Sequence, residues 1–106
     1  MKLVFLGTPA IAVTPLRALH AAGHEIDVVV TGPDVRRGRG TETSPSPVKA
    51  AALELGLRVE HDADAVLSSD ASLGVVVAFG KILRPHLLAH VPMVNLHFSL
   101  LPRWRG

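Results

Sequence analysis

The sequence predicts an α/β fold with a Rossmann-like, mostly parallel sheet and helices on both of its faces. Short apolar runs alternate along the chain with segments of helical pattern, and no internal repeat is present. Strands that are apolar on both sides are typical of a parallel sheet covered on each face. The 106 residues fit one small domain, or part of a larger one.

The first three elements are expected between residues 2 and 30. Lys2–Leu6 is an apolar run that reads as a buried strand, and it ends at the turn residues 7–9. Thr14-Pro15 is expected to open a helix, with the threonine as N-cap and the proline at the first helical position. Gly23 is expected to end this helix, and Ile26–Val30 is expected to form a second buried strand.

The second half of the chain continues the alternation. Ser46-Pro47 is expected to open a helix that runs through Leu55 and is closed by Gly56. The remaining expected elements are a short strand at 57–59, a weak helix at 63–69, the most apolar strand at 73–79, a short helix at 85–90 and a last strand at 93–97.

Composition excludes several classes of protein. With 48% hydrophobic and 19% charged residues, the chain is too apolar to be disordered. The lack of cysteine rules out disulfides, thiolate metal sites and a catalytic cysteine, and it is compatible with the cytoplasm. The longest apolar stretch, residues 73–80, is far short of the roughly 20 residues that a membrane-spanning helix needs. The first 13 residues superficially resemble a secretory signal, but residues 7–9 break the apolar run, which favours a buried strand.

Charge is distributed unevenly, although the formal net charge is only +2. Residues 51–72 are acidic, whereas the loop after the second strand and the end of the chain are basic. Both basic stretches lie at or beyond the carboxyl ends of strands, where ligands of such sheets collect, so they hint at an anionic partner. The basic residues concerned are Arg36, Arg37, Arg39, Lys49, Lys81, Arg84, Arg103 and Arg105.

Asn95 and His97 are the strongest candidates for chemistry. Residues two apart in a strand point to the same face, so the amide and the imidazole could be presented together at a strand end. An amide donates hydrogen bonds to a carbonyl oxygen that becomes negative, and a histidine donates or relays protons near neutral pH. Spacing alone favours the simpler alternative, in which Asn95 caps a turn and His97 is a satisfied buried histidine.

The run from Asn95 to Gly106, which ends in Ser-Leu-Leu-Pro-Arg-Trp-Arg-Gly, resembles the folate-site signature of the 10-formyltetrahydrofolate-dependent formyltransferases. Within that family it is most similar to the members that formylate methionyl initiator tRNA. Further blocks agree in order and spacing, namely residues 5–9, 33–34 with 38–40, 45–49 and 77–80.

The resemblance implies a role for several residues. Asn95 and His97 match two members of the family's Asn-His-Asp catalytic set. The segment that lines the tetrahydrofolate site is matched by Ser99, Leu100, Leu101 and Pro102, with Phe79 and Gly80 flanking a flat ring at a strand end. Arg39 lies in the loop that enters the tRNA acceptor stem, where Arg36 and Arg37 would add phosphate contacts.

The resemblance also implies that the chain is incomplete. It covers residues 1–106 as the amino-terminal portion of the catalytic domain, so the carboxyl-terminal β-barrel domain is expected to be absent. The family's aspartate lies beyond Gly106, and none of the five aspartates present fits its motif. We therefore expect a fragment that is not a competent catalyst alone, from an enzyme that is cytoplasmic, monomeric at full length and free of metal.

Other readings remain open at this point. The chain could belong to a formyltransferase that acts on an amino-sugar nucleotide or on glycinamide ribonucleotide, although residues 7–9 lack the glycine- and serine-rich turn expected for a ribonucleotide phosphate. It could also be a non-catalytic remnant that binds folate or tRNA.

Three weaker motifs are also present in the sequence. Residues 38–40 lack the third glycine of a dinucleotide-binding fingerprint, so a nicotinamide cofactor is not expected. His86 and His90 have metal-ligand spacing without an evident third ligand, and Trp104 is expected to pack against protein outside this chain.

Overall fold

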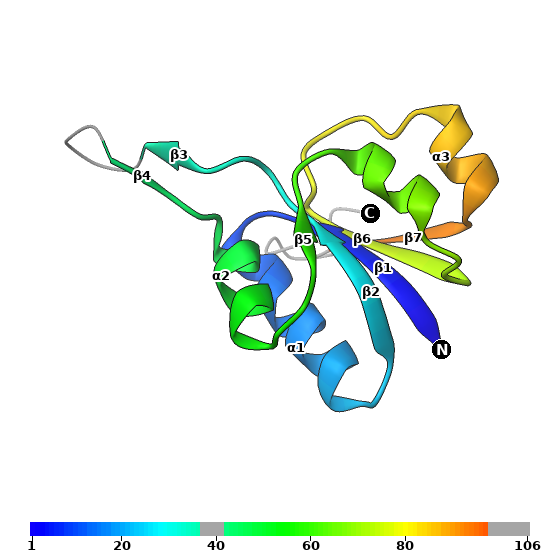
Figure 1. Cartoon of the computed structure of the whole chain (residues 1–106), viewed down its shortest axis with the longest axis horizontal. Helices are drawn as coiled ribbons and strands as arrows, with labels where there is room; N and C mark the ends of the chain where they lie inside the picture. The colour runs from blue at the N-terminus through cyan, green and yellow to red at the C-terminus, as the bar shows by residue number, and fades with distance from the viewer. Residues whose placement is uncertain (37–41, 98–106) are drawn as a thin grey trace, which may run out of the picture.

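The chain forms a parallel five-stranded sheet in a computed structural model that describes residues 1–36 and 42–97. Every neighbouring pair in this sheet is parallel, which confirms the predicted α/β class (Figure 1). The strands, in their spatial order, are β5 (Val59–Glu60), β2 (Glu25–Val30), β1 (Lys2–Gly7), β6 (Leu73–Val77) and β7 (Met93–Leu96).

Helices cover both faces of the sheet (Figure 1). One face carries the 3₁₀ turn η1 (Ala10–Ala12), α1 (Val13–Ala21) and α2 (Pro47–Glu54). The other face carries the 3₁₀ helix η2 (Ala63–Ser68) and α3 (Pro85–His90). Within the described ranges, no helix has the length and apolar character that crossing a membrane requires.

The central strand β1 divides the interior into two cores. Successive side chains of a strand point to opposite faces. Leu3 and Phe5 therefore pack against the α1–α2 side, whereas Val4 and Leu6 pack against the η2–α3 side. All four side chains are buried, which explains why the run is apolar on both sides.

Helix α2 begins as predicted, and α1 does not. The Ser46 hydroxyl accepts a hydrogen bond from the backbone N–H of Lys49 at 3.0 Å, with Pro47 at the first helical position. The prediction that Thr14 caps α1 is wrong, because η1 leads directly into the helix and Ala12 is the N-cap, without a side-chain bond. Pro15 fits inside the first turn, where a backbone N–H has no helical acceptor.

The basic loop contains a small hairpin that the sequence did not predict. Its strands β3 (Val35–Arg36) and β4 (Thr43–Ser44) pair antiparallel, with Val35 opposite Ser44. Two-residue strands are too short to show an alternating pattern. The hairpin projects away from the carboxyl edge of the main sheet (Figure 1).

Strand β6 ends two residues earlier than predicted, because the backbone changes direction. Ala78 adopts φ +50° and Gly80 adopts φ +80°, both in the left-handed region. A residue with a side chain rarely adopts this conformation, and its cost is about 1 kcal/mol. The turn from β6 toward α3 is therefore a locally strained segment.

We predict that Gly7→Ala destabilises the fold by about 1–3 kcal/mol, because the added methyl group overpacks the core. A Cβ at this position would lie 2.8 Å from the Val77 carbonyl oxygen and 2.9 Å from the Ala12 Cβ. The measurement is the free energy of unfolding in urea. Gly74→Ala is the matched control, because its nearest neighbour is the flexible Met93 side chain, so an equal loss in both variants would contradict the argument.

For Ala78, we predict opposite effects of two substitutions. Ala78→Gly relieves the left-handed strain and should maintain stability or raise it by up to about 1 kcal/mol. Ala78→Val adds a β-branched side chain at the same φ and should lower stability. Thermal unfolding of both variants beside the parent chain measures this, and a gain for valine would show that φ +50° is not a constraint.

Candidate functional site

The carboxyl ends of all five strands meet at one edge of the sheet, because all the strands are parallel. Ligands of open α/β sheets bind outside this edge. The residues that directly follow the strands there are Thr8, Thr31, His61, Ala78 and His97.

Asn95 and His97 line the same cavity at this edge. Asn95 lies in β7, opposite Val76 of the neighbouring strand, and His97 follows directly after the strand ends. Both residues are exposed, so the structure does not support the alternative in which His97 is a buried core histidine. Two polar groups that can donate hydrogen bonds therefore face one concave space.

The cavity has a volume of about 560 Å³, within the range of small-molecule sites. It is open, and most of its wall is apolar. Its lining residues are Ile11, Val76, Ala78, Phe79, Gly80, Lys81, Leu83, Leu88, Met93, Asn95, Leu96 and His97. The sequence analysis had assigned four of these residues to the site, Phe79, Gly80, Asn95 and His97, and had counted Lys81 only among the basic residues at the carboxyl ends of strands.

Phe79 belongs both to the core and to the cavity wall. It is 5% exposed and packs with Val76 and Leu87 in the second core cluster. Its neighbours on both sides have positive φ, with strain at Ala78 and none at Gly80, because glycine adopts this conformation freely. Phe79 therefore packs in the core and also forms part of the cavity wall.

Thr8 connects three of the segments that leave the carboxyl edge. Its hydroxyl accepts a hydrogen bond from the Gly32 N–H at 3.1 Å and lies 3.5 Å from the Phe79 carbonyl oxygen. Its own carbonyl oxygen accepts a bond from the Val48 N–H at 3.3 Å. The sequence marked Thr8 only as part of a turn, because nothing in the pattern shows which segments the turn contacts.

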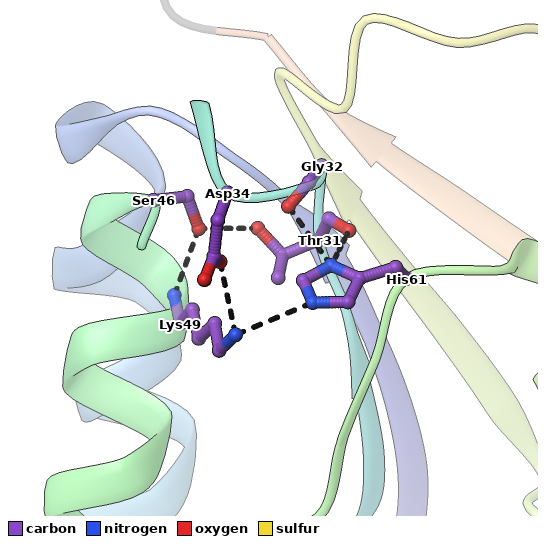
Figure 2. Close-up of polar contacts among 6 residues, drawn as sticks. All are labelled: Thr31, Gly32, Asp34, Ser46, Lys49 and His61. Atoms are coloured by element: carbon purple, nitrogen blue, oxygen red, sulfur yellow. Dashed lines mark hydrogen bonds and ion pairs between the residues drawn. The ribbon is translucent and has the colours of Figure 1, made fainter. Parts of the chain in front are cut away.

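A polar cluster holds the base of the β3–β4 hairpin (Figure 2). Buried hydroxyls of Thr31 and Ser46 lie 2.6 Å apart, where the chain leaves β2 and where it enters α2. The Lys49 ammonium lies 2.9 Å from an Asp34 carboxylate oxygen and 3.4 Å from His61 Nε2. This hairpin-base cluster consists of Thr31, Gly32, Asp34, Ser46, Lys49 and His61.

The structure describes only part of the residues expected to bind tRNA and folate. Arg36 is exposed on β3. Arg37 and Arg39, as well as the segment Ser99, Leu100, Leu101 and Pro102, lie outside the described residues. Trp104 lies outside them too.

His86 and His90 have separate partners. His86 Nε2 lies 3.0 Å from an Asp64 carboxylate oxygen, and His90 Nε2 lies 2.8 Å from the Ser69 carbonyl oxygen. Among residues 1–36 and 42–97, no group of three or more potential ligand side chains could hold a metal ion.

An ion pair at the amino-terminal ends of the strands, opposite the candidate site, shifts two pKa values. The side-chain hydrogen bond between Lys2 and Asp70, 2.7 Å long, raises the pKa of the ammonium and lowers the pKa of the carboxyl group. The attraction between the two charges also raises the pKa of Lys2 and lowers the pKa of Asp70. Lys2 begins β1 and Asp70 precedes β6, so the pair lies at the amino-terminal ends of these strands, away from Asn95 and His97.

Comparison with known proteins identifies the family. The profile described as "Formyl transferase" matches residues 1–106. Proteins called methionyl-tRNA formyltransferase are 52% identical in Heliobacterium modesticaldum, 53% in Synechococcus sp. (strain WH7803) and 48% in Neisseria meningitidis. Each comparison covers 100% of this chain but only 36%, 34% and 38% of the relative, respectively.

The chain thus spans about a third of the length of these relatives, in their amino-terminal portion. The profile covers the whole chain, and the similarity agrees with the parallel sheet and with the motif blocks. The chain belongs to the formyl transferase family.

Proposed function

We propose that this chain is the amino-terminal part of a cytoplasmic enzyme, monomeric at full length, that transfers a formyl group from 10-formyltetrahydrofolate to the amino group of methionyl initiator tRNA. The observation that carries the proposal is the convergence of Asn95 and His97 on one cavity at the carboxyl edge. The names of relatives near 50% identity support the choice of acceptor.

The cavity suits a flat donor that carries a polar reacting group. Its walls are mainly apolar, with Phe79 on one side, while the amide and imidazole occupy the β7 side. The resemblance also assigns Ser99, Leu100, Leu101 and Pro102 to the folate site. The donor enters as a substrate, and its formyl group supplies the carbon that the methionine amine attacks.

Asn95 and His97 then act on the formyl oxygen. As the amine adds to the carbon, this oxygen gains negative charge, and the amide N–H and the imidazole donate hydrogen bonds to it. One such donor is typically worth about 3 kcal/mol of the barrier. The amine loses a proton to a base, and N10 of the folate accepts one as the bond to the formyl carbon breaks.

Of the described residues that line the cavity, none is a carboxylate. We therefore assign to this chain the stabilisation of the oxygen and proton donation by His97, and we leave the base to the family's aspartate, which the resemblance puts beyond Gly106. Activity is accordingly expected of the full gene product rather than of residues 1–106 alone.

The direct test is a transfer assay with the full gene product, made in its own cell and checked by intact mass. With 10-formyltetrahydrofolate as donor, we expect formylation of methionyl initiator tRNA and none of glycinamide ribonucleotide. The reverse preference would overturn the proposed acceptor. Binding of folate or tRNA without transfer would instead favour the non-catalytic remnant.

We predict that His97→Ala lowers kcat of the full gene product by about 10²–10⁴-fold, because it removes a donor to the reacting oxygen. The side chain is exposed, so the midpoint of thermal unfolding should not change. His24→Ala, next to the amino-terminal end of β2, is the matched control. Near-normal turnover of the His97 variant would refute its catalytic role.

For the basic loop after the second strand, we predict that Arg39→Ala weakens tRNA binding and leaves folate binding unchanged. Loss of one phosphate contact should lower the slope of log K against log salt by about one. Arg58→Ala is the control, and it should leave tRNA binding unchanged. Arg58 directly precedes β5 and pairs with Glu60 at 3.1 Å. If the affinities for both tRNA and folate stay unchanged in the Arg39 variant, the assignment of the loop to tRNA is wrong.

A further inference from the structure

The β3–β4 hairpin has little packing of its own. The described residues on either side of its two strands and within them, 33–36 and 42–45, are exposed, apart from the half-buried Ser44. Among the described residues, two pairs join its strands. The direction in which the hairpin leaves the sheet therefore depends on the hairpin-base cluster rather than on a hydrophobic core.

His61 holds the chain where it leaves β2. Its Nδ1 lies 3.2 Å from the Thr31 carbonyl oxygen and 3.0 Å from that of Gly32 (Figure 2). Carbonyl oxygens only accept hydrogen bonds, so Nδ1 carries the proton. In the neutral ring, Nε2 is then an acceptor, and the group that faces it is the Lys49 ammonium at 3.4 Å.

Lys49 connects His61 to the segment that leads from β2 into the hairpin. The Lys49 ammonium is also 2.9 Å from a carboxylate oxygen of Asp34, which lies between β2 and β3. The Lys49 side chain is 21% exposed. The backbone N–H of Lys49 binds Ser46, whose hydroxyl contacts Thr31. Lys49 of α2 thus contacts Asp34, which precedes β3, and Ser46, which follows β4. It also contacts His61, which directly follows β5.

We propose that Lys49 is a positioning residue: by joining Asp34 to His61, it fixes the direction of the hairpin and hence the position of Arg36. The effect expected on tRNA rests on the proposed function, whereas the geometric effect does not. Pre-ordering a binding segment raises affinity, because less conformational freedom is lost on binding. Lys49 acts through the hairpin and makes no contact with RNA itself.

The geometric effect is tested by a distance measurement between two spin labels. Residues 1–106 contain no cysteine, so labels can be attached at Thr43→Cys on β4 and Ala18→Cys on α1, with any cysteine elsewhere in the full gene product replaced. In the parent protein, the distance between the two labels should form one narrow population. Lys49→Met and Asp34→Ala, which remove the contact between Lys49 and Asp34 from its two sides, should lose that narrow population.

Arg17→Met is the matched control, since it breaks another ion pair of α2, between Arg17 and Glu54 at 2.6 Å. This variant should keep the narrow population. A narrow population in both the Lys49 and Asp34 variants, or equal broadening in the Arg17 variant, would overturn the proposal, and the result does not depend on whether the protein binds tRNA.

The functional effect is measured as the dissociation constant for methionyl initiator tRNA at several salt concentrations. Lys49→Met should weaken binding about tenfold, or about 1.4 kcal/mol, with an unchanged salt slope, and Lys49→Arg should restore affinity. A slope lowered by about one would mean that Lys49 contacts phosphate directly, which overturns the positioning role. If the parent does not bind tRNA, the proposed function fails, and the label distances still decide the role of Lys49.

Discussion

Burial of β1 on both of its faces and along both of its edges is the constraint on which the rest of the structure depends. Its side chains alternate between the two cores, and its backbone pairs with β2 on one side and β6 on the other. A central strand of this kind requires a cover on each face, which the helices provide. It also aligns the carboxyl ends of its neighbours, so the candidate site is a direct result of how β1 is buried.

Sequence patterns were sufficient for elements whose cause is local. The strand at the start of the chain is visible as a run of apolar residues, and α2 is visible as a serine cap followed by proline. The start of α1 was misplaced, because a 3₁₀ turn, rather than a capping side chain, leads the backbone into that helix. Such a turn has no distinctive residue pattern.

The candidate site was only partly visible in the sequence, for a different physical reason. Asn95 and His97 are neighbours in one strand, so strand geometry alone predicts that they share a face. The cavity wall also includes Ile11 and Leu88, which come together only when helical segments from opposite faces meet at the carboxyl edge. The contact between Lys49 and His61 depends in the same way on the order of β2 and β5 in the sheet.

The pairing of β1 with β6 also has a consequence for synthesis of the chain on the ribosome. Leu3 lies opposite Leu73, so the two halves of this ladder are made 70 residues apart. The local partner β2 emerges early, but until β6 has left the ribosome, one edge of β1 has no hydrogen-bonding neighbour. An open strand edge is a template for pairing with other chains, so the nascent protein passes through a stage at which association competes with folding.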